Sequence, residues 1–136
     1  MDHVNWGKIC LAILAAAVAG SMTDWLFFGV LFHDKYLVHP EVWKKREKGE
    51  AGQIMISSAV GLLATAAFIL LSVGVYAESV HGVLKLAVAV WLIGSLPVVA
   101  NEHIFMKLHP ALLLSHSLGW LARFILAAIA YIYIGH

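Results

Sequence analysis

His33–Gly52 reads HDKYLVHPEVWKKREKGEAG, and it is the one long polar segment in a chain of 136 residues. It carries five of the nine Lys and Arg residues, which are Lys35, Lys44, Lys45, Arg46 and Lys48. Outside it the sequence is dominated by apolar residues, which make up 62% of the whole chain. The stretch therefore separates the first long apolar run from those that follow, and it fixes the direction in which each of them runs.

The overall composition is far from that of a soluble domain. Charged residues make up only 12% of the chain, whereas soluble domains have about 25%. The mean hydropathy is +0.87. A globular domain of this length cannot hide so much apolar surface from water, but a lipid bilayer can accommodate it. Because the length allows a single domain, the composition predicts one integral membrane domain covering residues 1–136.

Four apolar runs are each long enough to cross the hydrocarbon core, which takes about 20 helical residues. They extend over residues 9–32, 54–76, 83–106 and 111–134. None of them alternates apolar and polar residues as a membrane β-strand does. The sequence therefore predicts an all-α fold, an integral membrane four-helix bundle. Pro97 removes a backbone hydrogen bond inside the third run and predicts a kink there.

The first apolar run has a second interpretation. Lys8, the apolar residues after it and the small residues of Ala17–Ser21 resemble a cleavable signal peptide. The run continues as far as Phe32, which is longer than a signal peptide needs. A full membrane span is therefore the favoured interpretation.

The basic residues are distributed unevenly between the two sides of the predicted bundle. The first loop, 33–52, has five, and the turn after the third run adds Lys107. The opposite side has only Lys8 and Lys85. Cytoplasmic loops carry the excess of Lys and Arg. The pattern therefore predicts that both of these loops are cytoplasmic and that both termini lie outside. We expect the host to be a bacterial inner membrane.

The basic loop contains helix start and stop signals. Pro40 and Glu41 are typical of a helix start, and Gly49 of a helix end. They predict a short helix in the loop. A solvated loop that sets the orientation is favoured over a dedicated site for anionic lipid.

Polar and ionisable side chains interrupt the apolar runs. A charge at the centre of a membrane helix costs roughly 2.5–3.5 kcal/mol on insertion scales. Such residues are therefore candidates for a buried polar cluster, which would consist of Asp24, Ser57, Asn101, Glu102, His116 and Arg123.

Small residues recur four positions apart in each run, and such rows let membrane helices approach closely. The rows are Ala12, Ala16, Gly20 and Asp24; Ser57, Gly61 and Thr65; Gly94, Val98 and Glu102; and Ser115, Gly119, Arg123 and Ala127. Because each row includes a polar residue, we expect the polar residues to point into the bundle. Matched depths predict that Arg123 pairs with Asp24 and that His116 hydrogen-bonds Glu102.

Metal, cofactor and nucleic-acid sites are not expected. The segment Asn101–His103, with His109 and His116, contains histidine and carboxylate groups, but it fits neither HExxH nor a pair of Glu-x-x-His helices. Glu102 and His103 lie roughly 100° apart around a helix, so they do not face one ion. The single Cys10 excludes an intramolecular disulfide, and a net charge of +1 gives no basis for binding nucleic acid.

The chain resembles a known family in three segments. These are Asn5-Trp6, the segment Gly20–Gly29, which reads GSMTDWLFFG, and the segment His116–Trp120, which reads HSLGW. They resemble the domain of unknown function 1761 family of small four-helix bacterial membrane proteins. The resemblance covers nearly the whole chain and implies a bundle of four spans, without implying an activity.

Three functions are compatible with these residues. The leading hypothesis is a non-enzymatic helper subunit, homo-oligomer or member of a larger membrane complex, in which the polar cluster fixes assembly. The second is a membrane enzyme or small-molecule binder that uses Glu102 and His116 at a cavity facing the cytoplasm. The third is a proton-coupled transporter with a relay through Asp24, Glu102 and Arg123. No motif of soluble enzymes, such as GxSxG, GxGxxG or a Walker loop, is present.

Overall fold

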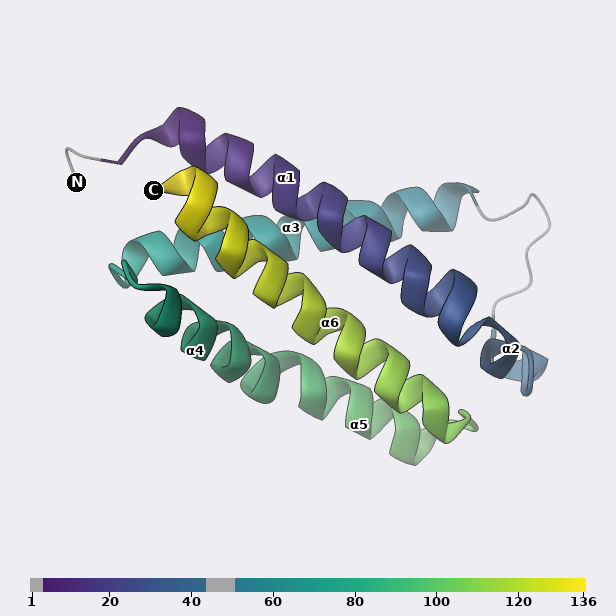
Figure 1. Cartoon of the computed structure of the whole chain (residues 1–136). Coiled ribbons are helices and arrows are strands. Elements are labelled where there is room, and N and C mark those ends of the chain that lie inside the picture. The colour runs from purple at the N-terminus through teal and green to yellow at the C-terminus, as the bar shows by residue number, and fades with distance from the viewer. Residues whose placement is uncertain (1–3, 44–50) are drawn as a thin grey trace.

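The structure, a computed structural model, describes residues 4–43 and 51–136. The four long helical rods alternate in direction along the chain, with the start of the first and the end of the last at one end of the bundle and α2 at the other (Figure 1). The rods cover Trp6–Leu31, Ala51–Gly74, Val80–Phe105 and Pro110–Gly135, and each is long and apolar enough to cross a membrane. The predicted all-α bundle of four membrane spans is confirmed, with ends within three residues of the predicted ones.

The outer surface of the bundle is apolar. Large side chains such as Leu14, Leu63 and Ile93 are 58%, 71% and 80% exposed, respectively. Water would make such a surface aggregate, whereas the hydrocarbon tails of a bilayer solvate it. The protein is therefore an integral membrane protein whose outer surface lies in lipid.

The first span changes its helical geometry half-way through the sequence GSMTDWLFFG. Helix α1 (Trp6–Asp24) begins after Asn5, whose side chain accepts a hydrogen bond from the backbone N–H of Lys8 at 3.1 Å. It continues as the π-helix η1 (Trp25–Leu31). Asp24 thus stands at the junction between α and π geometry, the kind of irregularity that often marks a functional site.

Two short helices follow the first span. They are α2 (His33–Tyr36) and the 3₁₀ helix η2 (Pro40–Val42). The predicted loop helix therefore begins at Pro40 as one 3₁₀ turn, and its predicted end at Gly49 lies outside the described residues.

The second span is the helix α3 (Ala51–Gly74). It ends before Tyr76, which has a left-handed backbone with φ 52°. The next helix, α4 (Val80–Val90), begins after Ser79, whose hydroxyl accepts from the backbone N–H of Gly82 at 3.0 Å.

The third span departs from α geometry in the turn before Pro97, and the kink expected there stays a prediction. After α4 the chain forms the π-helix η3 (Trp91–Ser95) and then returns to α geometry in α5 (Leu96–Phe105). Proline has no N–H to donate to the carbonyl four residues earlier, Ile93, and its ring crowds that carbonyl. The α ladder is therefore interrupted in the turn before Pro97.

The fourth span lies at the centre of the bundle. It consists of α6 (Pro110–Ala130) and the π-helix η4 (Tyr131–Gly135). His109 caps its start by accepting from the backbone N–H of Ala111 at 3.1 Å. Helix α6 contacts α1, α3, α4 and α5, and its rod is the most buried of the four spans.

The two halves of the bundle differ in their interiors. The half near the chain ends holds an apolar core, which consists of Ile9, Ala12, Ala16, Phe68, Ile69, Val83, Ala87, Phe124, Ala127, Ala128, Ala130 and Tyr131. In the other half, the first ten residues of α3 (51–60) are all exposed. The bundle is closely packed near its chain ends and opens toward the end that carries α2, where the polar groups lie.

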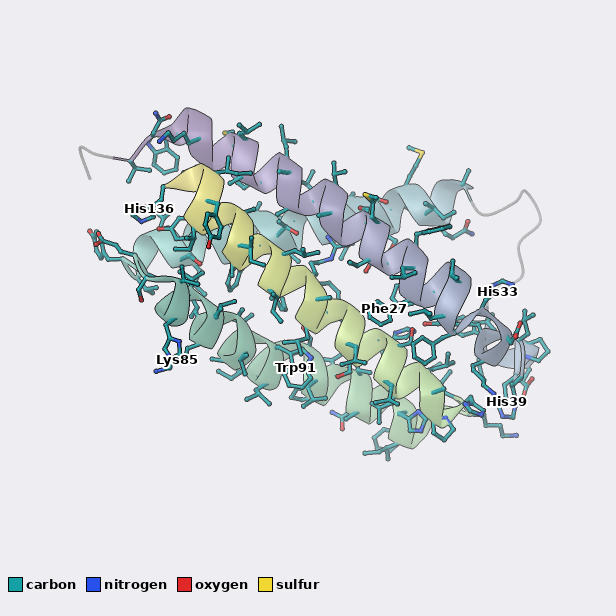
Figure 2. All side chains as sticks on the ribbon, in the orientation of Figure 1. Phe27, His33, His39, Lys85, Trp91 and His136 are labelled. Atoms are coloured by element: carbon teal, nitrogen blue, oxygen red, sulfur yellow. The ribbon has the colours of Figure 1, made fainter. Side chains whose placement is uncertain are left out.

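Charged and polar aromatic groups mark the two ends. His33 and His39 lie at the α2 end, whereas His136 lies at the opposite end and Lys85 in the same half as His136 (Figure 2). The chain ends are joined there, because the ammonium group of Lys8 donates to the carbonyl of His136 at 3.2 Å. This arrangement places both termini on one side of the membrane.

Candidate intramembrane binding site

A salt bridge joins the first and fourth spans inside the bundle. The guanidinium of Arg123 on α6 donates through Nη2 to Oδ2 of Asp24, the last residue of α1. The Arg123 side chain is 2% exposed and that of Asp24 is 27% exposed. At 1.5 Å per residue, Asp24 lies roughly 10 Å from the end of its span at Leu31. The predicted pair is therefore present as an intramembrane salt bridge.

The third member of this network comes from α3. Nη1 of Arg123 donates to the hydroxyl of Thr65 at 3.4 Å. That hydroxyl donates in turn to the carbonyl of Gly61 at 2.8 Å, so its acceptor site is free for the arginine. A single guanidinium therefore connects three of the four spans.

Two glycines give the guanidinium its space. A Cβ atom added at Gly61 would lie 2.5 Å from Nη1 of Arg123, and one added at Gly20 would lie 2.9 Å from the same nitrogen. Both distances are too short for real contacts, so a larger residue at either position would displace the arginine. The small residues at these positions make room for a charged group as well as for helix packing.

An aromatic ring lies against the remaining side of the arginine. Cζ of Arg123 is 5.9 Å from the centroid of the Trp120 ring, within the range of a cation–π contact. The Trp120 ring in turn stacks on Phe124 at 5.9 Å. The ring contributes to satisfying the buried positive charge and links it to the apolar core.

A cavity of about 190 Å³ lies beside the salt bridge, between α1 with η1, α3 and α6. Its lining residues are Asp24, Phe28, Ser57, Val60, Gly61, His116, Trp120 and Arg123. Four of them, Asp24, Ser57, His116 and Arg123, belong to the predicted polar cluster. The predicted cluster residues from three spans thus meet around one space.

Four aromatic side chains pack together at the α2 end of this cavity, and two of them, Phe28 and His116, line it. We call Phe28, Tyr36, Trp43 and His116 the aromatic lid. The ring of Tyr36 stacks on His116 at 5.6 Å and meets Phe28 edge-on at 5.9 Å. The indole of Trp43 donates to the carbonyl of Tyr36 at 2.7 Å. The short helices after the first span therefore fold back over the end of the bundle.

A hydrogen bond fastens the lid to α6. The hydroxyl groups of Tyr36 and Ser115 lie 3.1 Å apart. Burial raises the pKa of Tyr36 from 10.0 to about 12; the hydrogen bond with Ser115 opposes this change and the charge of Asp24 adds to it. The phenol of Tyr36 therefore stays neutral to a higher pH than a solvent-exposed tyrosine does.

Three of the four predicted rows of small residues lie where they were expected. Ala12, Ala16 and Gly20 are buried on α1, and Gly61 and Thr65 are buried on α3. On α6 the buried row consists of Ser115, Gly119, Arg123 and Ala127. Ser57 is exposed at the surface of the chain, but it lines the cavity.

The predicted row in the third span is wrong. Asn101 and Glu102 are exposed, and so are Gly94 and Val98. Val99 is buried instead, and Nδ1 of His103 is a buried atom. The third span therefore turns a different face toward the bundle from the one that its small residues indicate.

The π-helix η3 explains this difference. An α-helix that continued from the buried Ala87 at 3.6 residues per turn would bring Gly94 and Val98 inward. A π turn takes in one more residue, and one residue corresponds to about 100° of rotation. The inward face therefore moves on by one residue, to Val99 and His103.

His116 consequently has other neighbours than the predicted one. Within residues 4–43 and 51–136, no hydrogen bond joins it to Glu102; its ring packs against Phe28 at 5.1 Å and against Tyr36. A second, much smaller space of about 10 Å³ separates His116 from Glu102 and His103. That volume is close to the minimum for one water molecule, which would satisfy Nδ1 of His103.

A metal centre is not found in the part of the chain that the structure describes. No three His, Cys, Asp or Glu side chains gather there in a way that could hold an ion. His109, one of the histidines considered from the sequence, caps α6 instead.

Several residues of the site were not predicted as members. Tyr36 and Ser115 meet across 79 positions of the sequence, and no sequence pattern indicates such a contact. Thr65 could have been predicted from the sequence as a member of the site, because it follows Gly61 at a spacing of four and carries a hydroxyl group. Trp91 packs against the apolar core, and its indole donates to the carbonyl of Ser117 at 2.9 Å.

The comparison with known proteins agrees with the resemblance seen in the sequence. No curated protein and no solved structure matches the chain. The sequence pattern of the family described as "Protein of unknown function (DUF1761)" matches residues 11–132. This range includes the salt bridge, the lining of the cavity and the lid. The chain belongs to the DUF1761 family.

Proposed function

We propose that this protein binds a small molecule inside the membrane, in the cavity beside Arg123 and Asp24. The observation that carries the proposal is the cavity itself. A salt bridge that served only to hold helices together would be enclosed by packing, whereas this one lines a space of about 190 Å³ together with His116 and Ser57. Intramembrane ionisable groups that line a cavity are functional candidates by default.

Binding is a better fit to these groups than catalysis. Arg123 and Asp24 already satisfy each other, so neither is a free acid or base. Glu102, the acid of the enzyme and relay hypotheses, is exposed and does not line this cavity. A receptor or carrier subunit that holds its ligand without changing it accounts for the arrangement.

Two neighbouring serines provide a matched test. Both Ser57 and Ser58 are exposed on α3, but only Ser57 lines the cavity. Ser57→Trp should fill the cavity while both residues of the salt bridge stay in place, and Ser58→Trp should place the same side chain outside the cavity. Proteins extracted with their native lipids would be examined by native mass spectrometry for bound small molecules.

We expect a small molecule in fixed ratio to the wild-type chain and to the Ser58→Trp variant, and its loss from Ser57→Trp. The same small-molecule content in all three proteins would overturn the proposal.

The proposal includes an orientation in the membrane. The α2 end carries the basic loop and Lys107, and the other side carries Lys8 and Lys85. The excess of basic residues favours a cytoplasmic α2 end and outer termini in a bacterial inner membrane. The cavity then lies in the cytoplasmic half of the bilayer.

Labelling with a membrane-impermeant maleimide tests the orientation. In a Cys10→Ala background, Ser79→Cys should react in intact cells, and Lys35→Cys should react only after the membrane is opened. The reverse pattern would show that the bundle is inverted.

A further inference from the structure

The size of the cavity limits what it can hold. Its volume is about 190 Å³, and an apolar cavity of about 150 Å³ in a protein core holds one benzene molecule. The part of a ligand that lies inside this space is therefore about the size of one six-membered ring with short substituents. A whole phospholipid or a second helix does not fit inside it.

The walls suit the flat faces of such a ring. Phe28 and Trp120 line the cavity with aromatic surfaces, and Val60 adds an aliphatic one. Aromatic rings pack well against one another in offset or edge-to-face arrangements. The apolar part of the ligand is thus a ring, held among these three side chains.

The polar wall of the cavity has more hydrogen-bond donors on Arg123 than the described residues have acceptors for them. A guanidinium has five N–H bonds. The described residues provide two acceptors for Arg123, which are the carboxylate of Asp24 and the hydroxyl of Thr65. Because Arg123 lines the cavity, the N–H bonds that these two acceptors leave unused can donate to an oxygen atom on a ligand.

The charge balance of the site favours a neutral oxygen atom on the ligand over a carboxylate. The salt bridge of Arg123 and Asp24 carries no net charge. A carboxylate ligand would leave one negative charge without a partner in a low-dielectric environment, which is strongly unfavourable. It would also lie near the carboxylate of Asp24, which lines the same cavity. A neutral carbonyl or hydroxyl group accepts the same hydrogen bond without either cost.

The open side of the cavity indicates that the ligand enters it from the bilayer. The aromatic lid covers the α2 end of the cavity, with Tyr36 fastened to Ser115. The side toward α3 is open, because all residues from Ala51 to Val60 are exposed and two of the lining residues, Ser57 and Val60, belong to this stretch. A ligand that enters between the helices must already be dissolved in lipid.

From these observations we infer that the ligand is a neutral lipophile with one ring, whose carbonyl or hydroxyl oxygen accepts a hydrogen bond from Arg123. The inference rests on the proposed function and names the ligand class of that same site. The ring would lie between Phe28 and Trp120, with its oxygen toward the salt bridge.

Three probes of nearly equal shape test the class. They are 4-fluoroacetophenone, which is neutral and carries a carbonyl; 4-fluorobenzoate, which is an anion; and 1-ethyl-4-fluorobenzene, which has no oxygen. Binding is measured by fluorine NMR line broadening in lipid nanodiscs that hold the full chain. The Ser57→Trp variant corrects for partition into lipid, and Ser58→Trp is the matched control.

We expect the ketone to bind to the wild type and to Ser58→Trp at least tenfold more tightly than either other probe, and to lose this binding in Ser57→Trp. Tighter binding of the benzoate, or equal binding of the ketone and the hydrocarbon, would overturn the ligand class while cavity binding stands.

The two proposals fail in different ways. If no probe binds but native mass spectrometry detects a small molecule that Ser57→Trp removes, the ligand class is wrong and the proposed function holds. If no probe binds and no such molecule is found, both are wrong.

Discussion

Arg123 is the residue on which the interior of this protein depends. It is buried among three spans, with the carboxylate of Asp24, the hydroxyl of Thr65 and the ring of Trp120 around its guanidinium. Removing one partner from a buried pair leaves a bare charge, whereas replacing both partners can be nearly neutral. Single and double variants can therefore separate the cost of an unpaired buried charge from the contribution of the salt bridge itself to stability.

The Asp24→Asn variant should lose about 3–5 kcal/mol of unfolding free energy, because it leaves the charge of Arg123 unpaired. The double variant Asp24→Asn with Arg123→Gln should recover most of this loss. Unfolding of the purified protein in mixed detergent micelles measures both. A double variant as unstable as the single one would show that the pair is not the source of the loss.

Gly61→Ala should destabilise the protein by about 1–3 kcal/mol, a typical cost of overpacking, because the new Cβ would lie 2.5 Å from Nη1 of Arg123. Gly52 lies on the same helix with no atom within 4 Å of a Cβ added there. Gly52→Ala is therefore the control, and it should be neutral or slightly stabilising. Thermal unfolding in detergent compares the two, and equal melting temperatures would contradict the close contact at Gly61.

At the scale of the element, the irregular helices decide which residues reach the site. The π-helix η1 follows Asp24 directly and carries Phe28 to the cavity wall. The π-helix η3 leaves Glu102 exposed and brings Nδ1 of His103 to a buried position. The short helix α2 returns Tyr36 to α6 and closes the lid. Each of these placements depends on a departure from regular α geometry.

The lid should make the stability of the protein depend on pH at the alkaline end. The pKa of Tyr36 is raised from 10.0 to about 12 in the folded chain, so the unfolded chain releases this proton first. The contribution of the neutral Tyr36 phenol to the free energy of unfolding is fully present below pH 10.0 and is lost as the pH rises toward about 12.

Tyr36→Phe should lack this part of the pH dependence. It should also remove from the ultraviolet titration curve one phenol that ionises only at high pH. Tyr133→Phe, at an exposed residue outside the lid, is the control. An unchanged alkaline transition in Tyr36→Phe would show that the lid does not protect the phenol.

At the scale of the whole molecule, the bundle joins a closely packed half to an open one. The core near the chain ends brings the first and last spans into direct contact: a Cβ added at Gly135 would lie 3.6 Å from the Cβ of Ala12. This separation matches the spacing of about 3.5–4.5 Å between the Cβ atoms of a disulfide. The contact offers a direct test of the arrangement of the spans.

In a Cys10→Ala background, the pair Ala12→Cys and Gly135→Cys should form a disulfide on mild oxidation and change the mobility of the chain on a denaturing gel. The pair Ala12→Cys and Gly74→Cys should not, because nothing lies within 4 Å of a Cβ added at Gly74. Failure of the first pair to cross-link, or cross-linking of the second, would contradict the packing of the first span on the fourth.

The sequence by itself determined the solvent, the number of spans and one side-chain pair. Apolar runs of membrane length need no tertiary information, because lipid requires each span to satisfy its own backbone hydrogen bonds. The pairing of Asp24 with Arg123 was also predictable, since each follows a row of small residues and a lone charge in lipid must find a partner.

The tertiary structure alone decided the rest of the site. The π turn before Pro97 moved the buried face of the third span from Glu102 to its neighbour His103, because one added residue changes the phase of every residue after it. The contact of Tyr36 with Ser115, and the cavity beside Arg123, arise from how separate helices pack against each other. Helical period describes the faces of a single helix, whereas a cavity depends on the space left between several.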